Sequence, residues 1–497
     1  MIILGIFIWV LLSALIAIIL KDKSSVFTKV SSILTLIAII LYSVIRFSSG
    51  YTGGFISQTN IALSKSLGIY FSIGVSGFAD ALLILTGIIF AAAAFVTDRK
   101  LYPSSMFMMI MLTEAGMIGL LISRNFLFFY AFWELVLVPV YFIIGKFGGQ
   151  RKDGVSLKFF VYTHIASIFM LLSIFALYSY YDLQYKVLTF QMSELLQAMQ
   201  NATFTSALPE IAKYFILFGF VFAFLVKLPS FPVHAWLADS YEQAPYPGTI
   251  ILAGALSAMG GYGLFGIIFP FGGLIGTAGL DILVGLGLIS IAYFALTAMF
   301  QQSMKRMMAY ASAASMGFVT LAFASSFLDP LKSENALIVA SGGMFQIATH
   351  GIIMLLVFAS IYYIMLKTGS DRIPSLGGIY RDAPFLSTLL LGGLLASLGL
   401  PGLAGFVGEF SIIVGSFPAI GYWIFLLVFG MLITASYHIW AAQKALYGPY
   451  NEKLGKISDI GGAPLAMLLL VFVTILILGV FPVLFFGPIQ AYAGGII

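Results

Sequence analysis

Long apolar runs recur along almost the whole chain, and they constrain its fold more than any other feature. A helix of about 20 apolar residues can cross the roughly 30 Å of hydrocarbon in a bilayer. Irregular backbone cannot face lipid, and the runs are too long for barrel strands. We therefore expect an all-α polytopic membrane protein with about fourteen transmembrane helices. Their expected ranges are 2–20, 28–47, 71–96, 104–123, 126–145, 159–181, 210–229, 244–269, 277–300, 306–327, 335–366, 383–418, 420–446 and 462–486.

The composition agrees with a membrane location and excludes several classes of function. Hydrophobic residues make up 61% of the chain and charged residues only 9%, which leaves too little polar surface for a water-soluble fold. The net charge of +5 comes from basic residues scattered between apolar runs, so we expect no nucleic-acid partner. Without cysteine, and with four scattered histidines, the sequence predicts no metal site and no cofactor in this chain.

Basic residues are distributed unequally between the two sides of the expected helices. If the N-terminus lies outside, most of the 24 Lys and Arg residues fall in inside loops or helix ends. We therefore expect a multi-pass protein of the cell membrane with both termini outside the cytoplasm. The smaller outside set would be Arg46, Lys65, Arg124, Lys186, Lys213 and Lys332.

Two ionisable residues stand inside apolar runs, and a proline follows each of them closely. These residues are Glu134 and Lys227. An ionisable group at mid-membrane costs roughly 2.5–3.5 kcal/mol, so such residues usually serve ion or proton transfer. The alternatives are a structural acid for Glu134 and a snorkelling anchor for Lys227. Because each charge is tolerable at depth only when it is paired or hydrated, we expect the two side chains to face each other.

Proline and glycine interrupt two of the expected helices. The seventh is interrupted at Lys227–Pro232 and the twelfth at Leu398–Gly405. Such breaks free backbone carbonyls, which then need protein or water partners. Broken helices at corresponding positions of two halves are typical of inverted-repeat transporters, although prolines also kink helices for packing alone. Lys227 opens the first break and Glu409 follows the second.

Other polar residues in apolar runs are weaker candidates for proton transfer. Glu114 is an intramembrane acid on the expected helix before that of Glu134. His350 lies on a long apolar helix, where it could pass protons through its two nitrogens or be a satisfied core residue. His234 follows the first break and could equally bond local backbone. His164 and His438 are weaker candidates for proton transfer still.

Three segments resemble the antiporter-like membrane subunits of respiratory complex I. Phe132–Phe142 is similar to their fifth-helix signature, and Lys227–Leu237 resembles the stretch around their broken seventh helix. Gly399–Phe410 is similar to their twelfth-helix motif. The glutamate near the end of this third segment resembles the subunit 4 (chain M) branch, since sister subunits usually carry lysine there.

The resemblance covers roughly residues 70–450 and has implications for architecture and function. It implies fourteen helices, two inverted five-helix repeats that each contain a broken helix, and proton translocation driven by distant quinone reduction. On this basis we divide the chain into four parts. These are N-terminal helices at 1–103, a first repeat at 104–269, a second repeat at 270–446, and a C-terminal loop and helix at 447–497.

The family's central proton relay runs through an acid, two lysines, a histidine and an acid. By motif, its matching residues here are Glu134, Lys227, His350 and Glu409. The family's eighth-helix lysine falls on Ala258, so the middle of the relay departs from the pattern.

The family's tenth-helix histidine falls on Ser315, which is a second departure. Hydroxyls order water but cannot hold a proton's charge. We therefore expect water, with the hydroxyls of Ser257, Ser312 and Ser315, to replace the missing relay members. Glu114 and His234 stay accessory candidates.

The leading hypothesis is a proton-translocating membrane subunit of a complex-I-like quinone oxidoreductase. The chain would be part of an enzyme while carrying no redox centre itself. Its expected partners are the lipid bilayer and other membrane subunits of the same complex, including sister antiporter-like subunits. One alternative is a subunit of a multi-subunit cation/proton antiporter or of a membrane-bound hydrogenase. Another is a structural membrane spacer with a degenerate relay, which Ala258 and Ser315 would favour.

Overall fold

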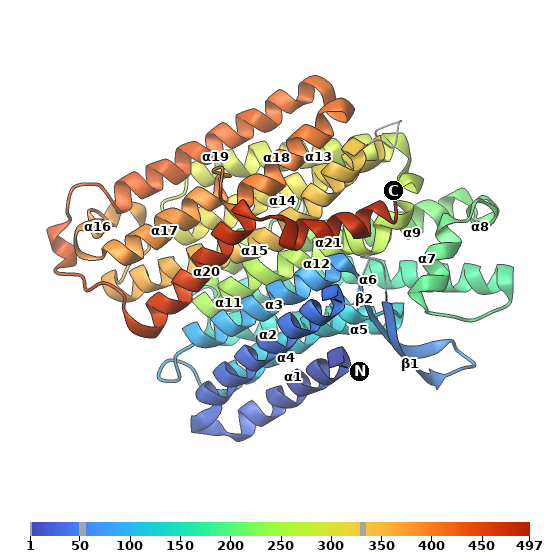
Figure 1. Cartoon of the computed structure of the whole chain (residues 1–497), viewed down its shortest axis with the longest axis horizontal. Coiled ribbons are helices and arrows are strands. Elements are labelled where there is room, and N and C mark those ends of the chain that lie inside the picture. Colours follow the sequence, from blue (N-terminus) through green and yellow to red (C-terminus); the bar gives the residue numbers. More distant parts are fainter. Residues whose placement is uncertain (1, 49–55, 329–333) are drawn as a thin grey trace.

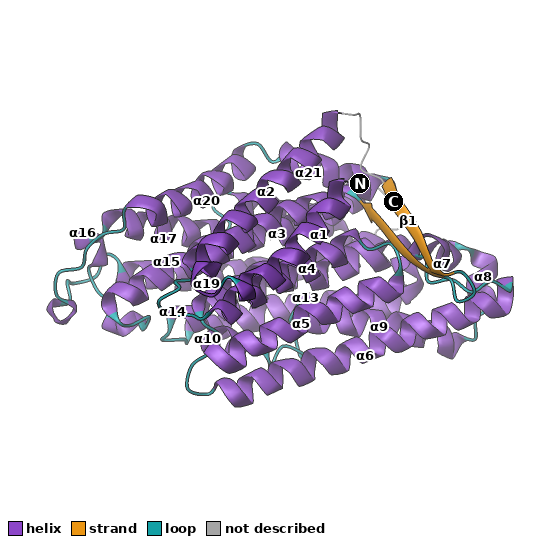
Figure 2. Ribbon diagram, turned by 90° about the horizontal axis from the view of Figure 1, so that it is seen from below, coloured by secondary structure: helices purple, strands orange, loops and turns teal. Residues whose placement is uncertain are grey.

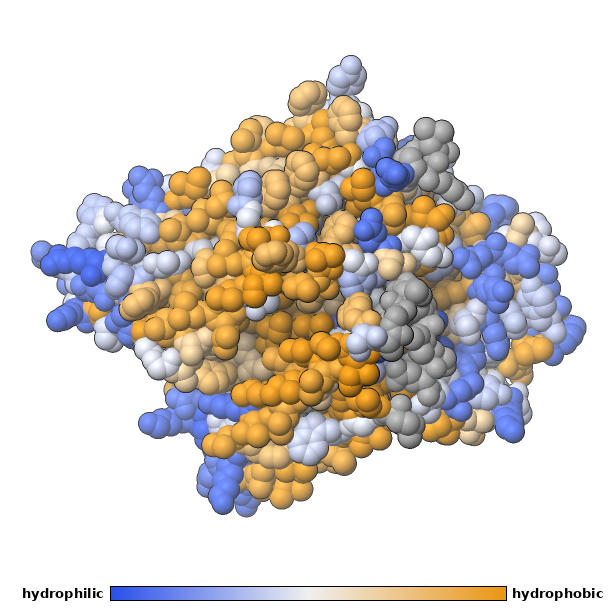
Figure 3. All heavy atoms as spheres, viewed as in Figure 1, coloured by the Kyte–Doolittle hydropathy of each residue, from blue (hydrophilic) through white to orange (hydrophobic). Residues whose placement is uncertain are grey.

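Side-by-side helices form almost the whole molecule (Figure 1). The computed structural model describes residues 2–48, 56–328 and 334–497, so Lys332 lies outside the described residues. Within these ranges, 11 helical segments are long and apolar enough to cross a membrane. Apolar residues cover the middle of the face seen in Figure 3, and hydrophilic residues gather at its two ends. The helices run between these ends, which is the arrangement of a multi-pass membrane protein.

The described N-terminal part contains three α-helices, one short 3-10 helix and a β-hairpin, and the sequence did not predict the hairpin. Residues 71–75, expected to begin a helix, instead belong to the second strand, where Phe71 pairs with Ile61. The prediction was wrong because alternating aromatic and β-branched residues find a partner strand here. Figure 2 shows the hairpin at one end of the helical body. The elements are α1 (Ile2–Ile19), η1 (Lys21–Lys23), α2 (Ser24–Ser48), β1 (Ile56–Ser64), β2 (Ile69–Val75) and α3 (Gly77–Val96).

The middle of the chain contains the first predicted break. One helix ends at Lys227 and the next begins at Leu237, so this break is confirmed. The expected helix 244–269 is divided by two π-helical segments, η2 (Leu252–Leu256) and η3 (Gly263–Ile268). The α-helices are α4 (Ser104–Ile122), α5 (Phe126–Phe147), α6 (Lys152–Tyr185), α7 (Met192–Gln200), α8 (Ala202–Ala207), α9 (Glu210–Lys227), α10 (Leu237–Gln243), α11 (Tyr246–Ile251) and α12 (Ser257–Tyr262).

The last part contains the second predicted break, which is also confirmed. One helix ends at Ser397 and the next begins at Ala404. The expected helix 462–486 is divided too, because Pro482 lacks the amide hydrogen that would continue the helix. The total of fourteen crossings stays a prediction. The α-helices are α13 (Gly276–Met299), α14 (Met304–Leu328), α15 (Glu334–Thr368), α16 (Ile379–Asp382), α17 (Pro384–Ser397), α18 (Ala404–Ile420), α19 (Ile424–Ala445), α20 (Gly462–Val480) and α21 (Val483–Gly494).

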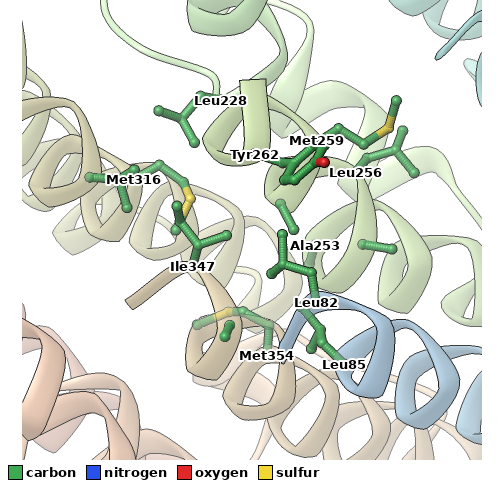
Figure 4. Close-up of a cluster of buried hydrophobic side chains, with 14 of the residues drawn as sticks. Leu82, Leu85, Leu228, Ala253, Leu256, Met259, Tyr262, Met316, Ile347 and Met354 are labelled. Carbon is green, nitrogen blue, oxygen red and sulfur yellow. The ribbon is translucent and has the colours of Figure 1, made fainter. Parts of the chain in front are cut away.

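Helix α15 lies at the centre of the molecule and is almost wholly enclosed by other helices. It packs against α14, α17, α18, α20, α21 and α3. Figure 4 shows how Ile347 and Met354 of α15 meet Leu82 and Leu85 of α3 beside Met259 of α12. This apolar cluster joins α3 to α12 and α15, which in turn pack against α9 at the first break and against α17 and α18 at the second. Close packing of this kind holds the candidate site residues at fixed positions.

A buried ion pair joins α2 to α3. Arg46 Nη1 lies 2.6 Å from Asp80 Oδ2, and Arg46 Nη2 donates to the carbonyl of Val75 over 3.0 Å. Both side chains are almost fully buried. From the sequence, Arg46 was assigned to the outside set of basic residues and Asp80 was not singled out, because the two residues are distant in the chain and come together only when the helices pack.

Removing one partner of this pair should destabilise the protein strongly. Arg46→Met leaves the Asp80 carboxylate buried and unpaired, which costs about 3–5 kcal/mol. Thermal unfolding in detergent should therefore show a clearly lowered midpoint. Arg99→Met is the matched control, because Arg99 pairs with the exposed Asp22 and should matter far less. Equal midpoints for the two variants would contradict the assignment.

Candidate functional site

Glu134 lies on α5 at a partly exposed position. Its carboxylate accepts a hydrogen bond from the Ser167 hydroxyl and lies 2.9 Å from His164 Nδ1, both on α6. The Glu134 side chain is 20% exposed and that of His164 38% exposed. The Phe160 ring stacks on the imidazole. The sequence ranked His164 low; the signal that could have found it is a histidine and a serine one turn apart on an otherwise apolar helix.

Lys227 lies at the last position of α9 and is almost completely buried. Its Nζ is 5.6 Å from the ring centroid of Trp133, the neighbour of Glu134, and 5.8 Å from that of Phe159. Within the described ranges its ammonium makes no hydrogen bond and no direct ion pair with Glu134. The expected pairing is therefore not a direct contact, and approach through water stays a prediction. Aromatic faces are a suitable environment for a buried cation.

One side chain within the first break and one from α13 hold the break in place. Trp236 Nε1 donates to the carbonyl of Val226 over 3.0 Å, and the Phe231 amide donates to Ser290 Oγ over 3.0 Å. Gly260 on α12 lets α9 approach closely, since a Cβ there would lie 2.6 Å from the amide nitrogen of Leu228. The hydrogen bonds of Trp236 and Ser290 satisfy backbone groups that the broken helix leaves without helical partners.

A chain of hydroxyl groups lies beside Ala258, the position at which a relay lysine was expected from the resemblance. Ser257 Oγ is 3.2 Å from the Tyr241 hydroxyl, which also lies near Ser312. Ser312 Oγ is in turn 2.9 Å from His350 Nε2. Tyr241 comes from α10, just after the first break, and the sequence did not identify it. These groups connect α12 to α15 through side chains that both donate and accept hydrogen bonds.

Ser315 lies one turn after Ser312 on the buried face of α14. On α15, Gln346 lies one turn before His350 and beside the carboxylate of Glu409. Glu409 comes from α18, just after the second break, and is almost fully buried. Gly399 is required here, because its φ is +76° and a Cβ would lie 2.4 Å from Glu409 Oε2.

The remaining candidates lie away from this set. Glu114 on α4 faces α2, where Ser32 Oγ is 3.2 Å from its carboxylate. His234 packs its ring against Phe294, with centroids 4.6 Å apart. His438 Nδ1 bonds the carbonyl of its own helix one turn earlier.

Acidic and basic residues form a cluster around α10 at one end of the helices. Asp239 lies 2.9 Å from Lys158 and 3.1 Å from Arg306, and Arg306 also bonds Glu242 over 2.6 Å. Arg151 contacts Glu242 as well. Partial burial raises the pKa of the Asp239 carboxyl. The Lys158 ammonium and the Arg306 guanidinium outweigh this effect and together hold the pKa below its ordinary value. The cluster ties the half-helix α10 to α6 and α14.

The described helices define a membrane protein with two interrupted helices and a buried ionisable residue at each interruption. Residues 123–434 match the model of the family described as NADH:quinone oxidoreductase/Mrp antiporter, transmembrane. The chain therefore belongs to this family. The matched range includes all four residues of the predicted relay, as well as Tyr241.

Similar proteins cover almost the whole chain. The chain is 36% identical to F(420)H(2) dehydrogenase subunit M of Methanosarcina mazei, over 93% of this chain and 90% of that protein. It is 32% identical to NADH-quinone oxidoreductase subunit M of Rickettsia conorii, over 89% and 87%. It shares the fold of a chain of respiratory complex I from Thermus thermophilus with bound NADH, with a TM-score of 0.83, 24% identity and coverage of 100% and 99%.

The close approach at Gly260 should be sensitive to a single added methyl group. Gly260→Ala places a Cβ against the end of α9 and should cost about 1–3 kcal/mol through overpacking. Gly285→Ala on α13 is the control, because nothing lies within 4 Å of its added Cβ. Thermal unfolding in detergent should show a lowered midpoint for Gly260→Ala alone. An unchanged midpoint for this variant would contradict the tight packing of α12 on α9.

Proposed function

We propose that this chain is the proton-translocating membrane subunit of a complex-I-like quinone oxidoreductase. The observation that carries the proposal is the series of polar side chains from α5 to α18, most of them buried, within a membrane domain. The chain would serve the enzyme as a transducer, while the redox chemistry takes place in other subunits. The series contains Glu134, Lys227, Tyr241, Ser257, Ser312, His350, Gln346 and Glu409.

In the proposed mechanism protons move along the membrane plane, from one side chain or ordered water to the next. A carboxylate and a lysine can each hold a proton, so Glu134 and Lys227 would store charge at the first break. The hydroxyls of Tyr241 and Ser312 would pass a proton without storing it, because they both donate and accept. His350 would receive it at one nitrogen and release it from the other.

Each of the two breaks would lie near one end of the relay, which runs from Glu134 to Glu409. In this proposal residues 104–269 and 270–446 are inverted repeats, with Lys227 at the first break and Glu409 at the second. The opposite charges make the two halves unequal, so a proton arriving at Glu409 neutralises it while a proton arriving at Lys227 creates a charge. Gln346 would orient the Glu409 carboxylate toward the helix that carries His350.

The proposed partners are sister membrane subunits of the same complex. Two similar proteins are named as subunits of dehydrogenase and oxidoreductase complexes. Glu134 and His164 are partly exposed on a face whose neighbours Val138 and Ile165 are exposed and apolar. A polar pair facing lipid is unfavourable, so a second membrane subunit covering this face would complete the site.

We also propose that the protein lies in the cell membrane with both termini outside the cytoplasm. Lys21, Arg151 and Arg372 belong to the basic loops that the positive-inside rule assigns to the cytoplasm. The structural-spacer alternative is less favoured, since Tyr241 of the first proposed repeat lies near Ser312 of the second, which supports a continuous relay.

Neutralising either terminal acid should uncouple the complex. Glu134→Gln and Glu409→Gln keep side-chain size but cannot release a proton. In the intact complex, reconstituted in vesicles, proton transport per quinone reduced should fall several-fold while assembly is retained. Glu194→Gln is the control, because Glu194 is an exposed residue of α7. Undiminished proton transport in both terminal variants would overturn the relay, and failure of assembly in both would favour the spacer.

The hydroxyl group of Tyr241 should contribute more to proton transport than the aromatic ring of this residue. Tyr241→Phe keeps the aromatic contact with Phe358 but removes the group between Ser257 and Ser312. Proton transport should slow several-fold with unchanged assembly. Tyr262→Phe is the matched control, because Tyr262 is equally buried and its hydroxyl bonds the backbone carbonyl of Leu121 instead. Equal rates in the two variants would remove Tyr241 from the pathway.

A further inference from the structure

Helix α2 turns its polar residues inward and its apolar residues outward. Its inward face contains small hydroxyl side chains that are spaced three or four residues apart and therefore share one side of the helix. Its outward face contains exposed aliphatic residues such as Val30 and Ile37. The buried hydroxyl residues are Ser24, Ser25, Thr28, Ser31, Ser32 and Thr35.

Three of the buried hydroxyls on α2, those of Ser24, Thr28 and Thr35, have no hydrogen-bond partner among the described residues. Membrane helices often use serine and threonine for close packing, and their hydroxyls then usually bond a carbonyl one turn earlier. Thr86 on α3 and Thr113 on α4 do so, each over 2.7 Å. Buried hydroxyls without a partner also occur on other helices, such as those of Ser325 and Ser341, so what distinguishes α2 is that its hydroxyls share one face with Ser32, which bonds a buried carboxylate.

A buried carboxylate lies against the same face. Glu114 on α4 is fully buried, and its Oε2 accepts a hydrogen bond from Ser32 Oγ over 3.2 Å. Its Oε1 has no hydrogen-bond partner in the described part of the chain, and no basic residue there pairs with it. A buried carboxylate without a cation is stabilised when it binds a proton or meets water.

The hydroxyl face begins at a water-exposed end of the protein and stops midway across the membrane. Ser24 follows η1, where Asp22 pairs with Arg99 and is 94% exposed. From Ser24 to Thr35 the helix rises about 16 Å, which is roughly half the hydrocarbon thickness. Beyond Thr35 the next inward residue is the buried Ile39, which separates the hydroxyls from the Arg46–Asp80 pair. The row of α2 hydroxyls therefore reaches the water on one side of the membrane only.

We propose that α2 and α4 form a proton-access path in which ordered water along the α2 hydroxyls connects this end of the protein to Glu114. Glu114 is then a proton-binding site additional to the relay. A water chain delivers a proton that forms an O–H bond at Oε1, and the reverse step returns it to water. Close contacts of Gly116 and Gly119 with α5 place the end of this path one helix from Glu134.

Infrared spectroscopy of the intact complex in lipid vesicles tests the path. In the wild type, Glu114 should contribute a band of a protonated carboxyl group that shifts when H₂O is replaced by D₂O. Glu114→Gln should remove this band. Replacing Thr28 and Thr35 together by valine should retain the band but slow its shift several-fold. Thr86→Val is the matched control and should leave the rate unchanged, because the Thr86 hydroxyl bonds its own helix.

Each other outcome counts against the path. A Glu114 band that never shifts in D₂O would show that water does not reach the Glu114 carboxyl group. A band that shifts at the wild-type rate in the double threonine variant would show that the α2 hydroxyls do not order the water path. A band that responds to replacing Na⁺ by choline would indicate a cation site instead. Glu134→Gln should leave the Glu114 band unchanged, so the path and the relay can fail separately. Should Glu114→Gln not assemble, the two threonine variants still decide.

Discussion

Hydrocarbon offers no hydrogen-bond partner and no counter-ion, and every polar group inside this membrane domain depends on what the protein supplies. The first break shows the consequence. The chain leaves helical geometry after Lys227, and Trp236 and Ser290 bond backbone groups there. Aromatic faces then surround the ammonium of the lysine. The same constraint explains why Arg46 and Asp80 pair where they are buried.

The two breaks serve the candidate site in opposite ways. At the first, a cation ends a helix, and at the second, Glu409 lies just inside the next helix against Gly399. The buried α15 lies between them and carries both His350 and Gln346. A rigid, enclosed helix is a suitable support for groups that must exchange protons over short distances, because its side chains have little room to drift.

In the proposed relay, local chemistry takes the place of the two residues that the motif resemblance leads one to expect. Ala258 and Ser315 cannot hold a proton charge, but Tyr241 and Ser312 offer hydroxyls in hydrogen-bond range of their neighbours. Hydroxyl groups pass a proton on without holding it, so the side chains at the two ends of the relay would hold the protons. This division predicts that variants at the ends change coupling, while variants in the middle change rate.

Length and hydropathy were sufficient to predict an all-α membrane fold, because the thickness of the bilayer sets how long an apolar run must be. The number of crossings stays a prediction. Proline and glycine were sufficient to predict both breaks, and motif similarity located Glu134, Lys227, His350 and Glu409 in the sequence. Only the tertiary structure decided which polar groups meet. The contact of His164 with Glu134 and the position of Tyr241 join different helices, and no spacing within one helix encodes such a contact. The hydroxyl face of α2 was not singled out from the sequence, and only the packing of α4 against it placed Glu114 beside Ser32.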